Sequence, residues 1–150
     1  NEWRHNAEWL FDTPALAWSV EPESERVRCR LFAYRMFPIR FCGGVPEPYS
    51  FPERMEAETM GFAPQPIDAS FERLGFDLVS RTAGNEFEHS PLSCNGLAAE
   101  VPTNRFCLLD TAEEAFALAP TLDPPGKPMR GEPGPYFIVE VWRQRLDAVR

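Results

Sequence analysis

The residues best suited to chemistry lie in residues 83–104, a long connection between two apolar segments. It contains His89 and, shortly after it, Cys94 beside an Asn-Gly pair. A thiol becomes a strong nucleophile when a nearby imidazolium lowers its pKa, and backbone amides can stabilise an oxyanion. Cys94 and His89 are therefore the candidate catalytic pair of a cysteine hydrolase. Because catalytic cysteine and histidine usually come from distant segments, we favour the alternative of a buried thiol and a loop histidine.

The same connection is also a candidate binding site. Structureless connections of this length are uncommon inside compact domains, and those that occur are often functional. Apolar residues are spaced to anchor it on the domain: Phe87, Leu92, Leu97 and Val101. The polar residues between them are the candidate binding groups: Asn85, Glu88, His89, Ser93 and Asn95. The structural alternative is a compact loop that only covers the sheet.

Glu140 is the most suggestive carboxylate, because it lies in the middle of the apolar segment Tyr136–Arg143. Burial raises the pKa of a carboxylate unless a cation holds it charged, and such groups gather at active sites. A structural ion pair with an arginine is the prediction that we favour. In the alternative, Glu140 is catalytic. Arg28 or Arg30, the serine at the 80–82 strand end and Glu140 resemble the arginine, serine and glutamate that ADP-ribosyltransferases assemble from separate strands, which implies a nucleotide-using transferase.

Arg26, Arg28 and Arg30 form a basic stripe with strand spacing in an acidic chain. Guanidinium groups bind carboxylates and phosphates through paired hydrogen bonds, which makes the stripe a candidate site for an anion or an acidic partner. Exposed charge rows are more often solvated faces paired with neighbouring carboxylates, and that interpretation is favoured here.

The net charge of −8 and the pI near 4.8 argue against a nucleic-acid partner, since phosphate binding needs clustered basic residues. No run of apolar residues is long enough to predict a membrane span. A single lysine and 16 prolines favour a GC-rich bacterial source.

The four cysteines include no Cys-x-x-Cys pair, so we predict reduced thiols in a cytoplasmic protein, without a metal or another cofactor. Cys29 and Cys107 fall at apolar positions of expected strands. Both are therefore expected to behave as small buried hydrophobic residues.

The elements that must position these groups follow from periodicity and capping signals. Alternation predicts strands over Ala15–Val20 and Arg26–Phe37, paired as a hairpin, and over Phe76–Thr82, Arg105–Leu109 and Tyr136–Arg143. The last is apolar on both faces, so it is expected at the centre of the sheet. Caps predict helices over about Phe51–Met60, from Asp68 through Leu74, and from Thr111 to Pro120. Residues 1–14 are expected to form an N-terminal arm, and proline and glycine predict loops at 38–50 and 120–135.

Together these elements predict a single α+β domain over residues 1–150, with a mostly antiparallel or mixed sheet, three short helices and long loops. No motif specifies a reaction. The sequence therefore favours a small acidic binding protein, such as a toxin-neutralising or scaffold module, over the cysteine hydrolase or the transferase. We expect a protein partner and keep a small-molecule ligand as an alternative; the sequence specifies no oligomeric state.

Overall fold

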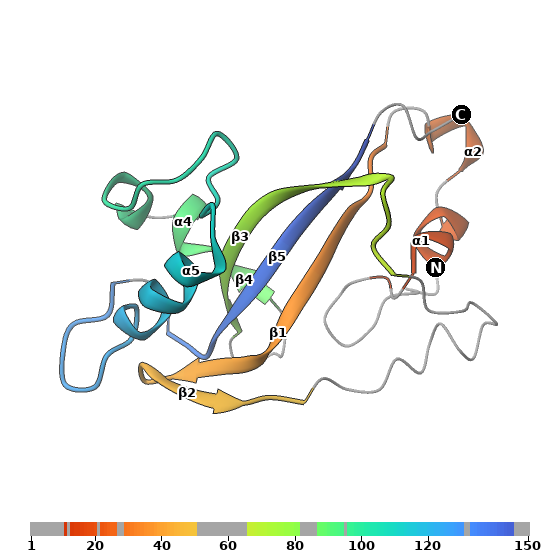
Figure 1. The fold of residues 1–150 in the computed structure, drawn as a ribbon. Helices are drawn as coiled ribbons and strands as arrows, with labels where there is room; N and C mark the ends of the chain where they lie inside the picture. The colour runs from red at the N-terminus through yellow and green to blue at the C-terminus, as the bar shows by residue number, and fades with distance from the viewer. Residues whose placement is uncertain are drawn as a thin grey trace.

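The structure, a computed structural model, describes residues 11, 13–20, 22–26, 29–50, 66–81, 87–94, 96–130 and 133–145. Its centre is an antiparallel five-stranded sheet with the strand order β2, β1, β5, β3, β4. The strands are β1 (Phe32–Cys42), β2 (Val45–Pro48), β3 (Phe71–Arg81), β4 (Phe87–His89) and β5 (Tyr136–Gln144). Figure 1 shows a long, twisted sheet with α4 and α5 at one end and α1 and α2 at the other.

Strand β5 lies in the middle of the sheet, as its sequence predicts. Its two faces belong to two separate cores. Tyr136 and Ile138 pack with residues of α5 (Ala112–Leu118) on the face that we call the front. Phe137 and Val139 pack on the opposite face, the back. Because both faces of β5 pack against apolar residues, its sequence is apolar from Tyr136 to Val141 except at Glu140.

Four α-helical segments lie in the described part of the chain: α1 (Pro14–Val20), α2 (Glu23–Arg26), α4 (Pro91–Cys94) and α5. There are also two short 3-10 helices: η1 (Gly96–Ala99) follows α4, and η2 (Ala119–Thr121) follows α5. The α+β class is confirmed, whereas the expected number and placement of the helices are partly wrong. None of the described helices has the length and apolar character that crossing a membrane requires.

The helix predicted after Thr111 is confirmed as α5. The Thr111 side chain accepts a hydrogen bond from the amide of Glu114 at 3.2 Å, and the Glu114 carboxylate accepts one from the amide of Thr111 at 3.0 Å. This capping box satisfies amides that a helix start leaves unpaired.

Replacing Thr111 with alanine should therefore lower the free energy of unfolding by about 1 kcal/mol. Urea denaturation measures the loss. The Glu113→Gln variant, changed in the same turn at a residue outside the capping box, is the control. Equal losses in the two variants would show that the cap contributes nothing specific.

The strand predicted over Ala15–Val20 is wrong, because this segment forms α1. Thr13 accepts a hydrogen bond from the amide of Leu16 at 3.1 Å, and Pro14 occupies the first helical position. Both features favour a helix start over a strand. The predicted hairpin with Arg26–Phe37 is wrong as well. Arg26 ends α2, while β1 begins at Phe32 and pairs with β5.

The loop predicted over 38–50 is instead a hairpin formed by the end of β1 and β2. Gly43 and Gly44 have φ angles of 52° and 74°, the left-handed pair that a two-residue hairpin turn needs. Pro38 lies within an irregularity of the β1/β5 register between Met36 and Arg40. The two prolines of β2 fit an edge strand, because proline offers no amide to an additional strand.

The helix predicted from Asp68 through Leu74 is also wrong. Asp68 caps a turn, with its carboxylate accepting from the amide of Ser70 at 2.7 Å, and β3 begins directly afterwards at Phe71. The strand predicted over Arg105–Leu109 is a turn in which only Leu109 bridges to Phe76. Residues 83–104 are not structureless, because they contain β4, α4 and η1.

Other predicted segments lie partly or wholly outside the described residues. These are the helix over Phe51–Met60 and most of the arm at 1–14, whose last residue, Pro14, begins α1. The described part of the 120–135 loop contains the end of η2 and, beyond it, no further helix or strand.

Candidate functional site

The residues predicted in the 83–104 connection are only partly described. His89 ends β4 opposite Ser80 of β3, and Cys94 ends α4. Asn85 and Asn95 lie outside the described residues, as do the side chains of Glu88, His89, Ser93 and Cys94. The catalytic pair and the binding groups of this connection therefore stay predictions.

The arginine stripe does not form one strand face. Arg26 belongs to α2, Arg28 lies outside the described residues, and Arg30 is exposed just before β1. Arg30 nevertheless lies near another arginine, Arg145, across the pairing of β1 and β5. The amide of Gln144 donates to the carbonyl of Leu31 at 2.9 Å, so the β1/β5 register continues beyond Phe32. One further step of that register sets Arg30 opposite Arg145.

Glu72 of β3 is a carboxylate that interacts with three further arginines: Arg143, Arg145 and Arg105. It lies opposite Arg143 in the β3/β5 register and accepts hydrogen bonds from Nε of Arg143 at 3.1 Å and from its Nη2. These bonds are the main cause that holds the pKa of Glu72 below its usual value, and the charges of Arg143, Arg145 and Arg105 add to the effect. Three arginines thus act on one carboxylate.

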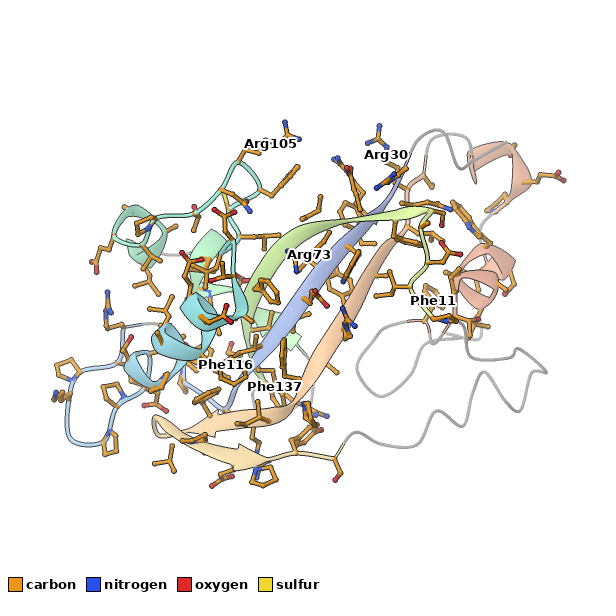
Figure 2. All side chains as sticks on the ribbon, in the orientation of Figure 1. Phe11, Arg30, Arg73, Arg105, Phe116 and Phe137 are labelled. Carbon is orange, nitrogen blue, oxygen red and sulfur yellow. The ribbon has the colours of Figure 1, made fainter. Side chains whose placement is uncertain are left out.

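Aromatic rings lie among these guanidinium groups. The guanidinium carbons of Arg105 and Arg143 lie 4.7 Å and 5.2 Å from the ring centroid of Phe106. Phe32, opposite Arg143 in the register, is 49% exposed. Figure 2 shows Arg30 and Arg105 at the same edge of the molecule.

We call this set the arginine surface: Arg30, Phe32, Glu72, Arg105, Phe106, Arg143 and Arg145. Its four arginines and one glutamate give a local charge of +3 in a chain of net charge −8. Among the residues that the structure describes, Arg30, Arg105 and Arg145 make no ion pair of their own. Within the described ranges, no carboxylate of the chain therefore neutralises these three guanidinium groups by direct contact.

Asn104 fixes the turn that presents Arg105 and Phe106. Its side-chain oxygen accepts from the amides of Phe106 at 2.9 Å and Leu108 at 3.3 Å. Its side-chain nitrogen donates to the carbonyl of Leu74 at 2.9 Å. One amide side chain thus organises the turn and ties it to β3, which explains why this segment is not the strand that its apolar residues suggested.

Glu140 is buried on the front face, and arginines contact both of its oxygens. Arg35 of β1 donates from Nε to Oε2 at 2.5 Å and also from Nη2. Nη1 of Arg73, from β3, lies 3.6 Å from Oε1. The structure therefore brings two arginines to Glu140, as the predicted ion pair requires, but neither is Arg30, which was considered with Glu140 for a transferase. Arg81, at the strand end considered for a transferase, instead donates to the hydroxyl of Tyr49.

Asp77 is a half-buried carboxylate, located on β3 in register with Val139 on the back face. Burial raises its pKa to about 6, although the hydroxyl of Ser90 donates to it at 2.5 Å and the amide of Leu78 at 2.8 Å. The pKa of Tyr34 is raised chiefly by burial and also by the charge of Asp77. Asp77 is thus held in an environment that disfavours its charged form.

The Asp77→Asn variant should be more stable than the wild type at pH 7. In the wild type, the pKa of Asp77 is about 6, above the ordinary value of 3.8. Between these two pH values the folded protein therefore binds the proton more tightly than the unfolded chain does. The contribution of Asp77 to stability therefore falls as the pH rises through this window, by about 2–3 kcal/mol in total. Asparagine keeps an acceptor for Ser90 without a charge.

The measurement is urea denaturation of both proteins at pH 4.5 and pH 7. Glu72 and Asp68, whose pKa values are lowered, are unchanged in the variant, so their contributions cancel when the two proteins are compared at the same pH. The gain in Asp77→Asn should be clearly larger at pH 7 than at pH 4.5. A gain independent of pH would mean that Asp77 is not the titrating group.

The two cysteines expected at buried strand positions are both described, and Cys29 is half-buried and precedes β1, so its expected strand position is wrong. Cys107 is exposed in a turn with a φ of 59°, so its expected place in an apolar strand is wrong. Burial is the main cause that raises the pKa of the Cys42 thiol, and its hydrogen bond with Glu47 adds to this, which makes the thiol a weak nucleophile at neutral pH. Within the described ranges no three His, Cys, Asp or Glu side chains are grouped as metal ligands.

Comparison of the chain with protein-family models, with curated proteins and with solved structures finds no match. The sequence did not indicate Arg35 and Arg73 at Glu140, nor three arginines of the arginine surface: Arg105, Arg143 and Arg145. The spacing of the sequence could have indicated two of them. Arg143, and Arg145 just after β5, continue the period-two spacing of Phe137, Val139 and Val141.

Proposed function

We propose that this chain is a binding protein whose arginine surface docks an acidic segment of a partner protein. The observation that carries the proposal is that three arginines act on the single carboxylate of Glu72, with Arg30 in register with one of them, in a chain of net charge −8. This narrows the binding role predicted from the sequence to one surface and one kind of partner.

The composition of the surface supports a protein partner. Arginine and aromatic residues are enriched at the energetically dominant positions of protein interfaces. A guanidinium stacked on a ring keeps its in-plane N–H groups available for a carboxylate, and Arg105 is stacked in this way on Phe106. The exposed ring of Phe32 adds apolar area beside these charges.

The charge of the whole chain favours a short acidic segment over a long polyanion. A nucleic acid would extend past the arginine surface onto an acidic protein, where its phosphates would be repelled. A peptide segment with a few carboxylates can confine its charge to the surface that complements it.

The test compares the wild type with the double variant Arg105→Gln, Arg145→Gln. Partners captured from a lysate of the source cells are identified, and the affinity of each purified partner is measured by calorimetry. We expect the double variant to bind an acidic partner about 10- to 100-fold more weakly, and added salt to weaken wild-type binding as well.

Arg130→Gln is the matched control, because Arg130 is exposed and pairs with Glu100 outside the arginine surface. Unchanged affinity in the double variant, or an equal loss in Arg130→Gln, would contradict the proposal. Selective labelling of Cys94 by a thiol-reactive probe at neutral pH, without partner binding, would support the cysteine hydrolase instead.

A further inference from the structure

We propose that Arg35 and Arg73, held by Glu140 on the front face, form a second site that binds one carboxylate or phosphate group. This site lies on the face of the sheet opposite to Arg143 and Phe106, so it is separate from the arginine surface. Figure 2 shows Arg73 over the middle of the sheet, away from Phe116 of α5.

The site has a specific geometry. Glu140 lies on the central strand, and its arginine partners approach from the strands on either side. Arg35 takes one carboxylate oxygen and Arg73 the other. The two guanidinium groups are therefore drawn together over one residue, although they start from strands that are not neighbours.

The balance of charge and exposure leaves the site able to accept another anion. The side chain of Glu140 is 7% exposed, whereas those of Arg35 and Arg73 are 63% and 52% exposed. The negative charge is thus buried beneath two positive charges that face solvent. One carboxylate neutralises only one of the two guanidinium groups, so a net charge of +1 remains at the surface.

The guanidinium groups are also ordered before any ligand binds. Arg35 lies over the ring of Trp142 at 5.7 Å and Arg73 over the ring of Phe76 at 5.4 Å, in addition to their contacts with Glu140. Exposed arginines are usually mobile and lose conformational entropy when they bind. Two arginines fixed by a carboxylate and by rings avoid part of this cost.

The chemistry of the donors defines the class of ligand. Planar guanidinium groups recognise the paired oxygens of carboxylates and phosphates. A single net positive charge suits one such group and not a chain of phosphates. The ligand is therefore a small molecule or a side chain that carries one carboxylate or one phosphate monoester.

The experiment is an NMR titration of the full chain with sodium phosphate and, separately, with sodium acetate, both at constant ionic strength and pH 7. The reporters are the Nε–H groups of Arg35 and Arg73 and the indole N–H of Trp142, which is buried and makes no hydrogen bond within the described structure. We expect saturable shifts of these three signals. Saturation by phosphate alone assigns a phosphate monoester, and saturation by acetate assigns a carboxylate.

The Arg35→Gln variant should weaken the binding of the saturating anion about tenfold, the effect of losing one charge-assisted hydrogen bond. Arg40→Gln is the control on the same strand, since Arg40 pairs with Glu47 and not with Glu140. Arg35→Lys, which keeps the charge but not the planar donor group, should also weaken binding and serves if the glutamine variant does not fold.

Shifts that increase linearly without saturation in the wild type would overturn the proposal. Equal anion affinity in the wild type and in a folded Arg35 variant would overturn it as well. Neither result would bear on the arginine surface, because its own test changes Arg105 and Arg145.

Discussion

Replacing both Arg35 and Arg73 with methionine should lower the free energy of unfolding by about 3–5 kcal/mol, because Glu140 would be left buried without a cation. The side chain of Glu140 is 7% exposed and lies between the apolar residues Val139 and Val141 of the central strand. Either single replacement should cost less, since the remaining arginine still contacts one oxygen of the carboxylate. Urea denaturation at pH 7 measures each variant.

The addition of Glu140→Met to the double variant provides the decisive comparison. When the carboxylate is removed together with its partners, the buried charge no longer exists, and the triple variant should recover to within about 1 kcal/mol of the wild type or exceed it. A double variant as stable as the wild type, or a triple variant as unstable as the double, would contradict the assignment. This outcome concerns stability alone and is independent of whether the arginines bind an anion.

The elements that could be predicted from the sequence are those with strong local signals. From Tyr136 to Val139, strand β5 carries apolar residues on both faces, a pattern that indicates a central position in the sheet. Helix α5 carries a complete capping box, whose partners lie three residues apart. In both cases the information lies within one short window, so distant contacts were not needed to interpret it.

The errors arose where a local pattern was short and tertiary contacts decided. Leu16, Trp18 and Val20 alternate like a strand, but three residues are too few to distinguish a strand from the short helix that Thr13 caps. Asp68 does cap its neighbours, yet the chain that follows pairs with β5 as a strand. Capping chemistry identifies a turn of the backbone and does not fix what comes after it.

The arginine surface as a whole could not be predicted from short stretches of the sequence, for a different reason. Its arginines come from the start of β1, from the end of β5 and from the turn at Arg105, which lie far apart in the sequence. The strand register brings Arg30 and Arg145 together, and Asn104 places the turn beside them. A stripe pointed to Arg30 and the spacing along β5 to Arg143 and Arg145, but only the pairing of the strands shows that these arginines lie side by side.

Gly75 illustrates the same limit, since it directly follows the segment predicted as a helix and instead lies inside β3. Its φ of 147° accompanies a register irregularity between Arg73 and Gly75, and the chain at Leu109 passes directly over it. A Cβ atom at this position would lie 2.5 Å from the carbonyl oxygen of Leu109 and 2.9 Å from the Cβ of Leu108. The close approach allows Phe76 and Leu109 to exchange two backbone hydrogen bonds of 2.9 Å.

Replacing Gly75 with alanine should consequently lower the free energy of unfolding by roughly 3 kcal/mol or more, from the strained φ together with the displaced hydrogen bonds. The matched control is Gly126→Ala, because Gly126 also has a positive φ, of 68°, but no atom within 4 Å of its Cβ position. This control should lose only about 1 kcal/mol, the cost of the left-handed conformation alone. Urea denaturation compares the two losses, and equal values would show that the contact with Leu109 is not what requires glycine.

Because the displaced segment includes the turn held by Asn104, any folded Gly75→Ala protein should also bind the acidic partner more weakly, whereas Gly126→Ala should bind it normally.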